Sequence, residues 1–141
     1  MTPSKETIIL AVAGGLAFWV ANFAISLTPI AAEYRAALAI SYFPMLLEAL
    51  LGGLMIGCCV SYFLLRFFDK LPTQKPILKS IILSFIILII VTMLIEVPAK
   101  FLTTTSDAWH YFLIGAMFNV IRIPALGIVI GYLYNKLNEG E

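Results

Sequence analysis

Long runs of apolar residues, separated by short polar segments, form the main pattern of this chain. Four runs carry at most one charged residue each, and they cover residues 7–27, 45–65, 80–95 and 109–135. The runs show no alternation of apolar and polar positions, which favours helices over strands. About 20 helical residues, each rising about 1.5 Å, cross a bilayer core of about 30 Å. The pattern therefore predicts four membrane-spanning helices.

The predicted fold class is all-α: a polytopic four-helix transmembrane bundle in which residues 1–141 form a single domain. The expected spans are about residues 6–29, 44–67, 77–97 and 108–135. The first apolar run exceeds the roughly 7–15 residues of a signal-peptide core, so it is interpreted as a retained helix. Ser106 or Asp107 is expected to cap the fourth helix.

The first connection between spans also has helical character. Residues 31–42 are rich in alanine, the strongest helix former. They predict either an interfacial helix on the outer surface or an early start of the second span, kinked at Pro44. A span from Ala36 to Arg66 would be about 46 Å long, far more than the bilayer core requires. The interfacial helix is therefore favoured.

Composition supports a membrane location. The chain is 62% hydrophobic and 12% charged, and its mean hydropathy is +1.01, which is far from the average of soluble domains. The bilayer is therefore its expected environment. The net charge is +1 and there is no polybasic tract, so no nucleic-acid partner is expected.

The basic residues predict the orientation. With four spans, one side of the membrane collects six of the nine: Lys5, Arg66, Lys70, Lys75, Lys79 and Lys136. The opposite side has Arg35 and Lys100, and Arg122 lies within a span. The positive-inside rule then places both termini in the cytoplasm. We expect a multi-pass protein of the cell (inner or plasma) membrane.

Four polar residues interrupt the apolar runs at a similar height. Each lies about 21 to 27 Å along its helix axis from the basic residue at the cytoplasmic end of that helix. These residues are Asn22, Glu48, Glu96 and Arg122. An unpaired charge in the membrane costs a few kcal/mol, so Arg122 is expected to meet a carboxylate inside the bundle. Glu96 is the first choice of partner and Glu48 the second. For each glutamate, reaching out to the membrane surface is an equally good interpretation.

This count of charges leads to the functional hypothesis. One arginine and two glutamates leave one carboxylate over, which must be hydrated, protonated or bound to a cation. Asn22, Glu48, Glu96 and Arg122 are therefore the candidate ligand-binding or ion-binding residues. The prediction is transport or permeation of a small solute or ion, and the alternative is a non-catalytic accessory or assembly subunit of a membrane complex. A homo-oligomer is compatible with both.

Two glycine motifs predict close helix packing. Gly53 and Gly57 in the second span, and Gly127 and Gly131 in the fourth, match the small-xxx-small pattern. Packing within the molecule is favoured over an oligomer interface. Glu48 and Arg122 each precede their motif by five residues, which indicates either a duplicated helical hairpin or chance. The third span has no glycine and is expected to face lipid.

No catalytic, metal or cofactor site is predicted. The chain has one histidine and two cysteines, and Cys58 and Cys59 are adjacent rather than spaced as metal ligands or a redox pair. There is no phosphate-binding loop or nucleophile motif. An enzyme acting on a lipid or quinone is accordingly the third choice.

Overall fold

The computed structural model describes residues 2–71, 73–102 and 107–139, and every regular element within them is a helix. In chain order these are α1 (Pro3–Ser26), α2 (Pro29–Ala37), α3 (Tyr42–Arg66), the short 3-10 helix η1 (Phe68–Lys70), α4 (Pro76–Val91), the π-helix η2 (Thr92–Glu96), α5 (Val97–Phe101) and α6 (Ala108–Asn138). Four helical stretches are long and apolar enough to cross a membrane. The predicted all-helical fold with four such helices is confirmed.

Local sequence signals explain where the helices begin. Thr2 accepts a hydrogen bond from the Lys5 amide at the start of α1, and Thr28 accepts one from the Ala31 amide at the start of α2. A proline follows each of these threonines, where its missing N–H costs nothing. The N-cap of α6 is Asp107, but its side chain makes no capping hydrogen bond. Ser106, the other expected cap, lies outside the described residues.

The first connection folds as a separate helix. α2 covers the nine residues Pro29–Ala37, so it begins and ends earlier than the expected segment, residues 31–42. It ends in a turn in which the Ile40 amide donates to the Arg35 carbonyl at 2.8 Å. Ala39 has a φ of 55° in this turn, a conformation that glycine normally supplies. The second span thus starts afresh at Tyr42 rather than continuing from α2.

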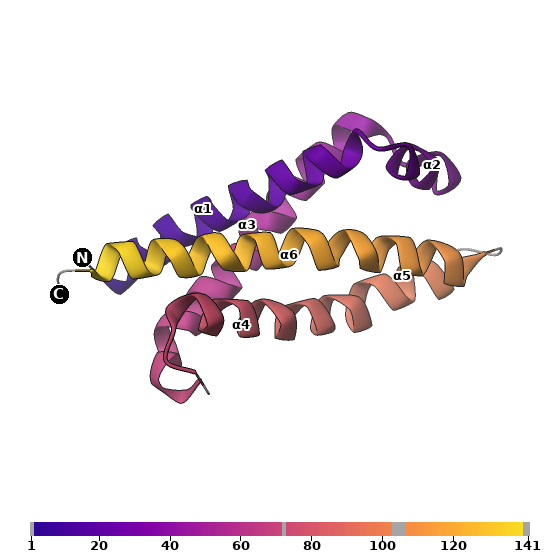
Figure 1. The fold of residues 1–141 in the computed structure, drawn as a ribbon. Coiled ribbons are helices and arrows are strands. Elements are labelled where there is room, and N and C mark those ends of the chain that lie inside the picture. Colours follow the sequence, from indigo (N-terminus) through magenta and orange to yellow (C-terminus); the bar gives the residue numbers. More distant parts are fainter. Residues whose placement is uncertain (1, 72, 103–106, 140–141) are drawn as a thin grey trace.

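The long helices form two hairpins that pack side by side. α1 packs mainly on α3, and α4 packs mainly on α6, while α6 also packs along α1 (Figure 1). The first turns of α1 and the last turns of α6 meet at one end of the bundle, where Asn138 donates to Glu6 at 2.7 Å. We call this the terminal end. α2 and the start of α6 lie at the opposite end, which we call the α2 end (Figure 1).

Both glycine motifs pack inside the molecule. A Cβ atom on Gly57 would lie 2.7 Å from the Ala11 carbonyl oxygen of α1, and one on Gly131 would lie 2.5 Å from Ile77 Cα of α4. Contacts this short with backbone show that only glycine allows these helices to approach so closely. The favoured interpretation, packing within the molecule, is confirmed for both motifs.

Aliphatic side chains fill the half of the bundle nearer the terminal end. The large side chains with no exposed surface are Leu10, Val60, Leu64, Ile123, Leu126 and Ile130. α6 is the central helix: 44% of its most apolar 18 residues are buried, against 17% for the third span, Pro76–Ala99. The exposed face of α4 carries only large apolar residues such as Phe85, Ile86 and Ile89, in agreement with a lipid-facing surface. Buried polar residues occur in both halves: Lys79 and Ser80 lie near the terminal end, and Asn22, Ser26 and Asn119 lie toward the α2 end.

Candidate functional site

A cavity of about 130 Å³ lies near the α2 end of the bundle. α1, α2, α3, η2 and α6 all contribute to its wall, together with Ile40 from the connection between α2 and α3. Its polar lining residues are Asn22, Ser26, Tyr34, Arg35, Glu96 and Arg122. Three of the four residues singled out from the sequence therefore meet here, and Glu48 is not among them.

Arg122 enters the cavity from the middle of α6. Its Nη1 donates to Asn22 Oδ1 at 2.6 Å, and its Nη2 donates to Asn119 Oδ1. Its guanidinium carbon lies 4.9 Å from the centre of the Phe18 ring. Within the described part of the chain, its buried Nε has no hydrogen-bond partner. Two amides thus solvate the guanidinium, but as neutral groups they do not neutralise its charge.

Asn119 connects Arg122 to Glu96. The Asn119 amide nitrogen donates to Glu96 Oε1 at 3.5 Å, while its oxygen accepts from Arg122. The expected direct contact between arginine and carboxylate is therefore replaced by a contact through an amide; within the described residues Arg122 forms no ion pair. The reason is that Asn119 lies one turn before Arg122 on the same face of α6 and occupies the space between the two charges.

The π-helix η2 turns Glu96 toward the cavity. In a regular α-helix, Ile95 would lie about 20° from the buried Ser84 and Glu96 about 120° away. In η2 the Val97 amide donates to the Thr92 carbonyl, five residues back, which is equivalent to one inserted residue. Ile95 is accordingly 58% exposed, while Glu96 lines the cavity. Pro98 explains the position of η2, because it cannot donate a hydrogen bond to the preceding turn.

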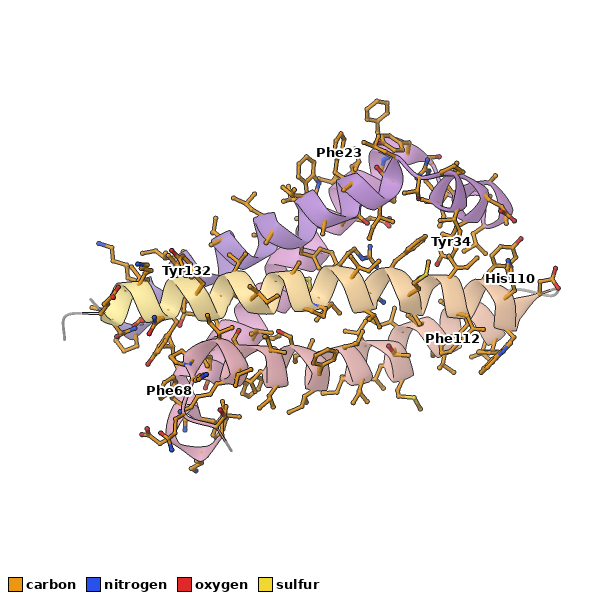
Figure 2. All side chains as sticks on the ribbon, in the orientation of Figure 1. Phe23, Tyr34, Phe68, His110, Phe112 and Tyr132 are labelled. Carbon is orange, nitrogen blue, oxygen red and sulfur yellow. The ribbon has the colours of Figure 1, made fainter. Side chains whose placement is uncertain are left out.

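Gly115 lets the polar groups of two other elements approach α6. A Cβ atom at this position would lie 2.9 Å from Glu96 Oε2 and 3.1 Å from the Tyr34 hydroxyl. The Tyr34 ring also packs edge-on against Phe118, with 5.4 Å between ring centres. Figure 2 shows Tyr34 between α2 and α6. Any larger residue than glycine at position 115 would therefore displace both oxygens.

Arg35 supplies a second guanidinium to the cavity. It comes from the last turn of α2, and its Nη1 donates to the Ser26 carbonyl at 3.3 Å. Its guanidinium carbon lies 4.8 Å from the centre of the Tyr42 ring, a favourable cation–π position. The sequence drew attention to Arg35 only as a basic residue of the outer side, not as part of a site.

Glu48 lies outside this site. It is exposed on α3, on the side of the helix away from α1, and it does not line the cavity. Five residues separate it from Gly53, which turns it by about 140° from the face that packs on α1. The structure therefore does not bring Glu48 together with Asn22, Glu96 and Arg122, and the other interpretation, that it reaches toward the membrane surface, fits its exposure.

The charge balance of the site is the reverse of the expected one. The cavity contains two arginines, Arg35 and Arg122, and one glutamate, Glu96. With all three ionised the lining carries a net positive charge rather than a surplus carboxylate. The sequence argument failed because it counted intramembrane residues only and left out the arginine that α2 brings over the cavity.

Sequence reasoning also missed Tyr34, Gly115 and Asn119. One signal was available: Asn119 and Arg122 are three residues apart within a span, which places them on one helix face. The contributions of Tyr34 and Gly115 depend on the placement of α2 over α6, which no local pattern encodes. Within the described residues, no group of three or more His, Cys, Asp or Glu side chains is placed to hold a metal ion.

Fold and site together define a class: a helical protein with four potential membrane spans and a polar, arginine-containing cavity near one end of the bundle. Comparison of the chain with protein-family models, curated proteins and solved structures finds no match.

Proposed function

We propose that this chain is an integral membrane protein that binds a small polar solute in the cavity and transports it. Asn22, Glu96 and Arg122 are the solute-binding residues in this proposal. The observation that carries it is a cavity lined by six polar residues, with room for a solute, in a bundle that exposes many large apolar side chains. Charged groups are expensive at membrane depth, and those that face a cavity are usually functional.

The packing on the terminal side of the cavity favours a carrier over an open channel. Ile123, Leu126 and Ile130 follow Arg122 along α6 and have no exposed surface. Gly14 of α1 is in contact with the Ile130 side chain, so the two helices close tightly there. Solute passage would need these helices to separate, as in alternating access.

We place both termini in the cytoplasm and the cavity toward the outside of the cell membrane. The support is the excess of basic residues at the terminal end, which the positive-inside rule assigns to the cytoplasm. α2 would then be the interfacial helix of the outer surface. A solute would enter the cavity from the outer side.

An accessory or assembly subunit is the second candidate, and one surface supports it. The exposed face of α3 carries Glu48, Met55, Cys59 and Tyr62, and a Cβ atom on Gly52 of the same face would meet nothing within 4 Å. Small and polar residues are typical of helix contacts in membranes. A second copy of the chain or another membrane protein would cover this face.

Proteoliposome uptake tests the proposal. The purified protein is reconstituted and offered radiolabelled acetate, phosphate, glycine, choline and potassium in turn. We expect protein-dependent uptake of at least one solute, its loss with Arg122→Gln, and its retention with the matched control Glu48→Gln. No uptake of any solute would contradict transport. If the protein also purifies as a larger complex that Glu48→Leu disrupts, the accessory role is favoured.

A further inference from the structure

We propose that the cavity binds a small oxyanion between Arg122 of α6 and Arg35 of α2. This inference rests on the proposed function and names the chemical class of its solute. Both guanidinium groups line the same cavity of about 130 Å³. The oxyanion is either a free solute, such as a carboxylate or phosphate, or the headgroup of an anionic lipid that reaches in from the membrane.

The wall of the cavity carries a net positive charge when its charged side chains are ionised. Arg35 and Arg122 outnumber Glu96, and Glu96 already accepts a hydrogen bond from Asn119. A net positive charge in a site bordered by apolar helices is costly unless a counter-charge accompanies it. One bound monoanion brings the site to neutrality. A cation would add a second uncompensated positive charge, so a cation, one of the options that the sequence left open, is the less favourable occupant.

Both arginines have N–H groups that are not used within the described part of the protein. A guanidinium has five N–H groups, and the two amide contacts of Arg122 use one from Nη1 and one from Nη2. Arg35 donates from Nη1 to the Ser26 carbonyl. Each arginine therefore keeps N–H groups for a ligand. Arginine binds carboxylate and phosphate through paired N–H groups, and such charge-assisted bonds are about twice as strong as neutral ones.

Neighbouring side chains fix the orientation of the Arg122 guanidinium. Asn22 of α1 and Asn119 of α6 hold its guanidinium from two sides, and the Phe18 ring lies against it. A carboxylate in direct contact would have neutralised the charge, and the amides leave it intact while restricting its orientation. A preorganised guanidinium that keeps its charge is what an oxyanion site requires.

The size of the cavity limits the ligand. A volume of about 130 Å³ corresponds to a few water molecules at roughly 30 Å³ each in the liquid. Acetate, phosphate and similar ions fit this space, whereas nucleotides do not. Because Arg35 and Tyr34 belong to α2 and Arg122 to α6, a bound oxyanion would also tie α2 to the bundle.

The test is ligand-dependent thermal stability of the protein in nanodiscs. Discs of pure phosphatidylcholine receive sodium acetate or sodium phosphate at constant ionic strength, with sodium chloride as the balance. A second set of discs contains phosphatidylglycerol and receives no added oxyanion. Wild type is compared with Arg122→Gln and Arg35→Gln, and the matched control is Glu48→Gln.

We expect a saturable rise of the melting temperature. A rise with acetate or phosphate identifies a free solute, and a rise only with phosphatidylglycerol identifies a lipid headgroup. In either case Arg122→Gln and Arg35→Gln should each weaken the apparent affinity by about tenfold or more, and Glu48→Gln should not. Should Arg122→Gln fail to fold, Arg35→Gln at the α2 end still decides the matter.

The inference is overturned if neither oxyanion source raises the melting temperature of wild type, or if both arginine variants show the same rise as wild type at the same ligand concentrations. Its failure is distinguishable from failure of the proposed function. Uptake of choline or potassium without any oxyanion effect would keep transport and reject the oxyanion. An oxyanion-dependent rise without uptake of any solute would keep the site and reject transport.

Discussion

The two helical hairpins use the same packing device and place a charged residue at the same distance from it, but with opposite results. In the α1–α3 hairpin, Gly53 and Gly57 pack on α1, and Glu48, five residues before Gly53, is exposed. In the α4–α6 hairpin, Gly127 and Gly131 pack on α4, and Arg122, five residues before Gly127, lies in the cavity. An offset of five residues turns a side chain by about 140° in both helices.

The difference lies in what covers the second face of each helix. α6 has α4 on one side and α1 on the other, whereas α3 packs mainly on one helix, α1. The residue opposite the glycine face is therefore half-buried in the cavity in α6 and exposed in α3. A sequence motif can fix which residues lie opposite a helix contact, but only the arrangement of the whole bundle decides whether they are inside.

Gly131→Ala is expected to have the largest effect on stability. Its Cβ atom would lie 2.5 Å from Ile77 Cα, and backbone cannot move aside, so we predict a loss of about 3 kcal/mol in the free energy of unfolding. Gly57→Ala, beside the Ala11 carbonyl at 2.7 Å, should cost nearly as much. Denaturation by SDS titration in mixed micelles measures both.

Gly52→Ala is the matched control for these two variants, because a Cβ atom there would meet nothing within 4 Å. Its stability should be unchanged or higher by up to about 1 kcal/mol, since alanine is the better helix former. Equal losses in all three variants would show that the two motifs are not the contacts that hold the hairpins together.

Asn119→Leu is expected to have the next largest effect. Asn119 is 3% exposed and connects Arg122 to Glu96, so its loss leaves two half-buried charged groups without this partner. We predict a loss of about 2 kcal/mol in the free energy of unfolding. Glu48→Leu, on the exposed position of the other hairpin, should change it by less than about 0.5 kcal/mol. A larger effect of Glu48→Leu would contradict the difference between the hairpins.

The π-helix η2 gives a third comparison, between a deletion and an insertion. Removing Met93, which is 61% exposed, should convert η2 to regular α-helix and keep Glu96 facing the cavity. Inserting one alanine after Met93 should turn Glu96 away by about 100°. Oxyanion-dependent stabilisation should survive the deletion and fall by about tenfold in affinity with the insertion. Equal behaviour of the two variants would remove Glu96 from the site.

Ala39→Gly should have the smallest effect. Ala39 has a φ of 55° in the turn that ends α2, and glycine adopts this conformation without the penalty that a Cβ atom brings. We predict a gain of about 1 kcal/mol or less in local stability, visible as slower hydrogen exchange of the Ile40 amide. Faster exchange in the variant would show that the turn does not control the end of α2.

The sequence was sufficient for the helices and for part of the site. Length and hydropathy predict the four long helices, and the common height of Asn22, Glu96 and Arg122 predicts that they meet. It was insufficient for Arg35, because the position of α2 over the cavity depends on tertiary packing with Phe118 and Ile114. It was equally insufficient for Glu48, because a helix offset gives direction but not surroundings.

The sign of the electrostatic potential in the cavity tests the central claim most directly. Ser26 lines the cavity and His110 is exposed at the same end, so Ser26→Cys and His110→Cys are made in a Cys58→Ser, Cys59→Ser background. Sulfonatoethyl and trimethylammonioethyl methanethiosulfonates are then compared in detergent. For each variant, the ratio of the rate with the anionic reagent to the rate with the cationic reagent is measured. We predict that this ratio is about tenfold higher for Ser26→Cys than for His110→Cys, and that adding Arg122→Gln removes the difference. Faster reaction with the cationic reagent, or a preference unchanged by Arg122→Gln, would contradict the account.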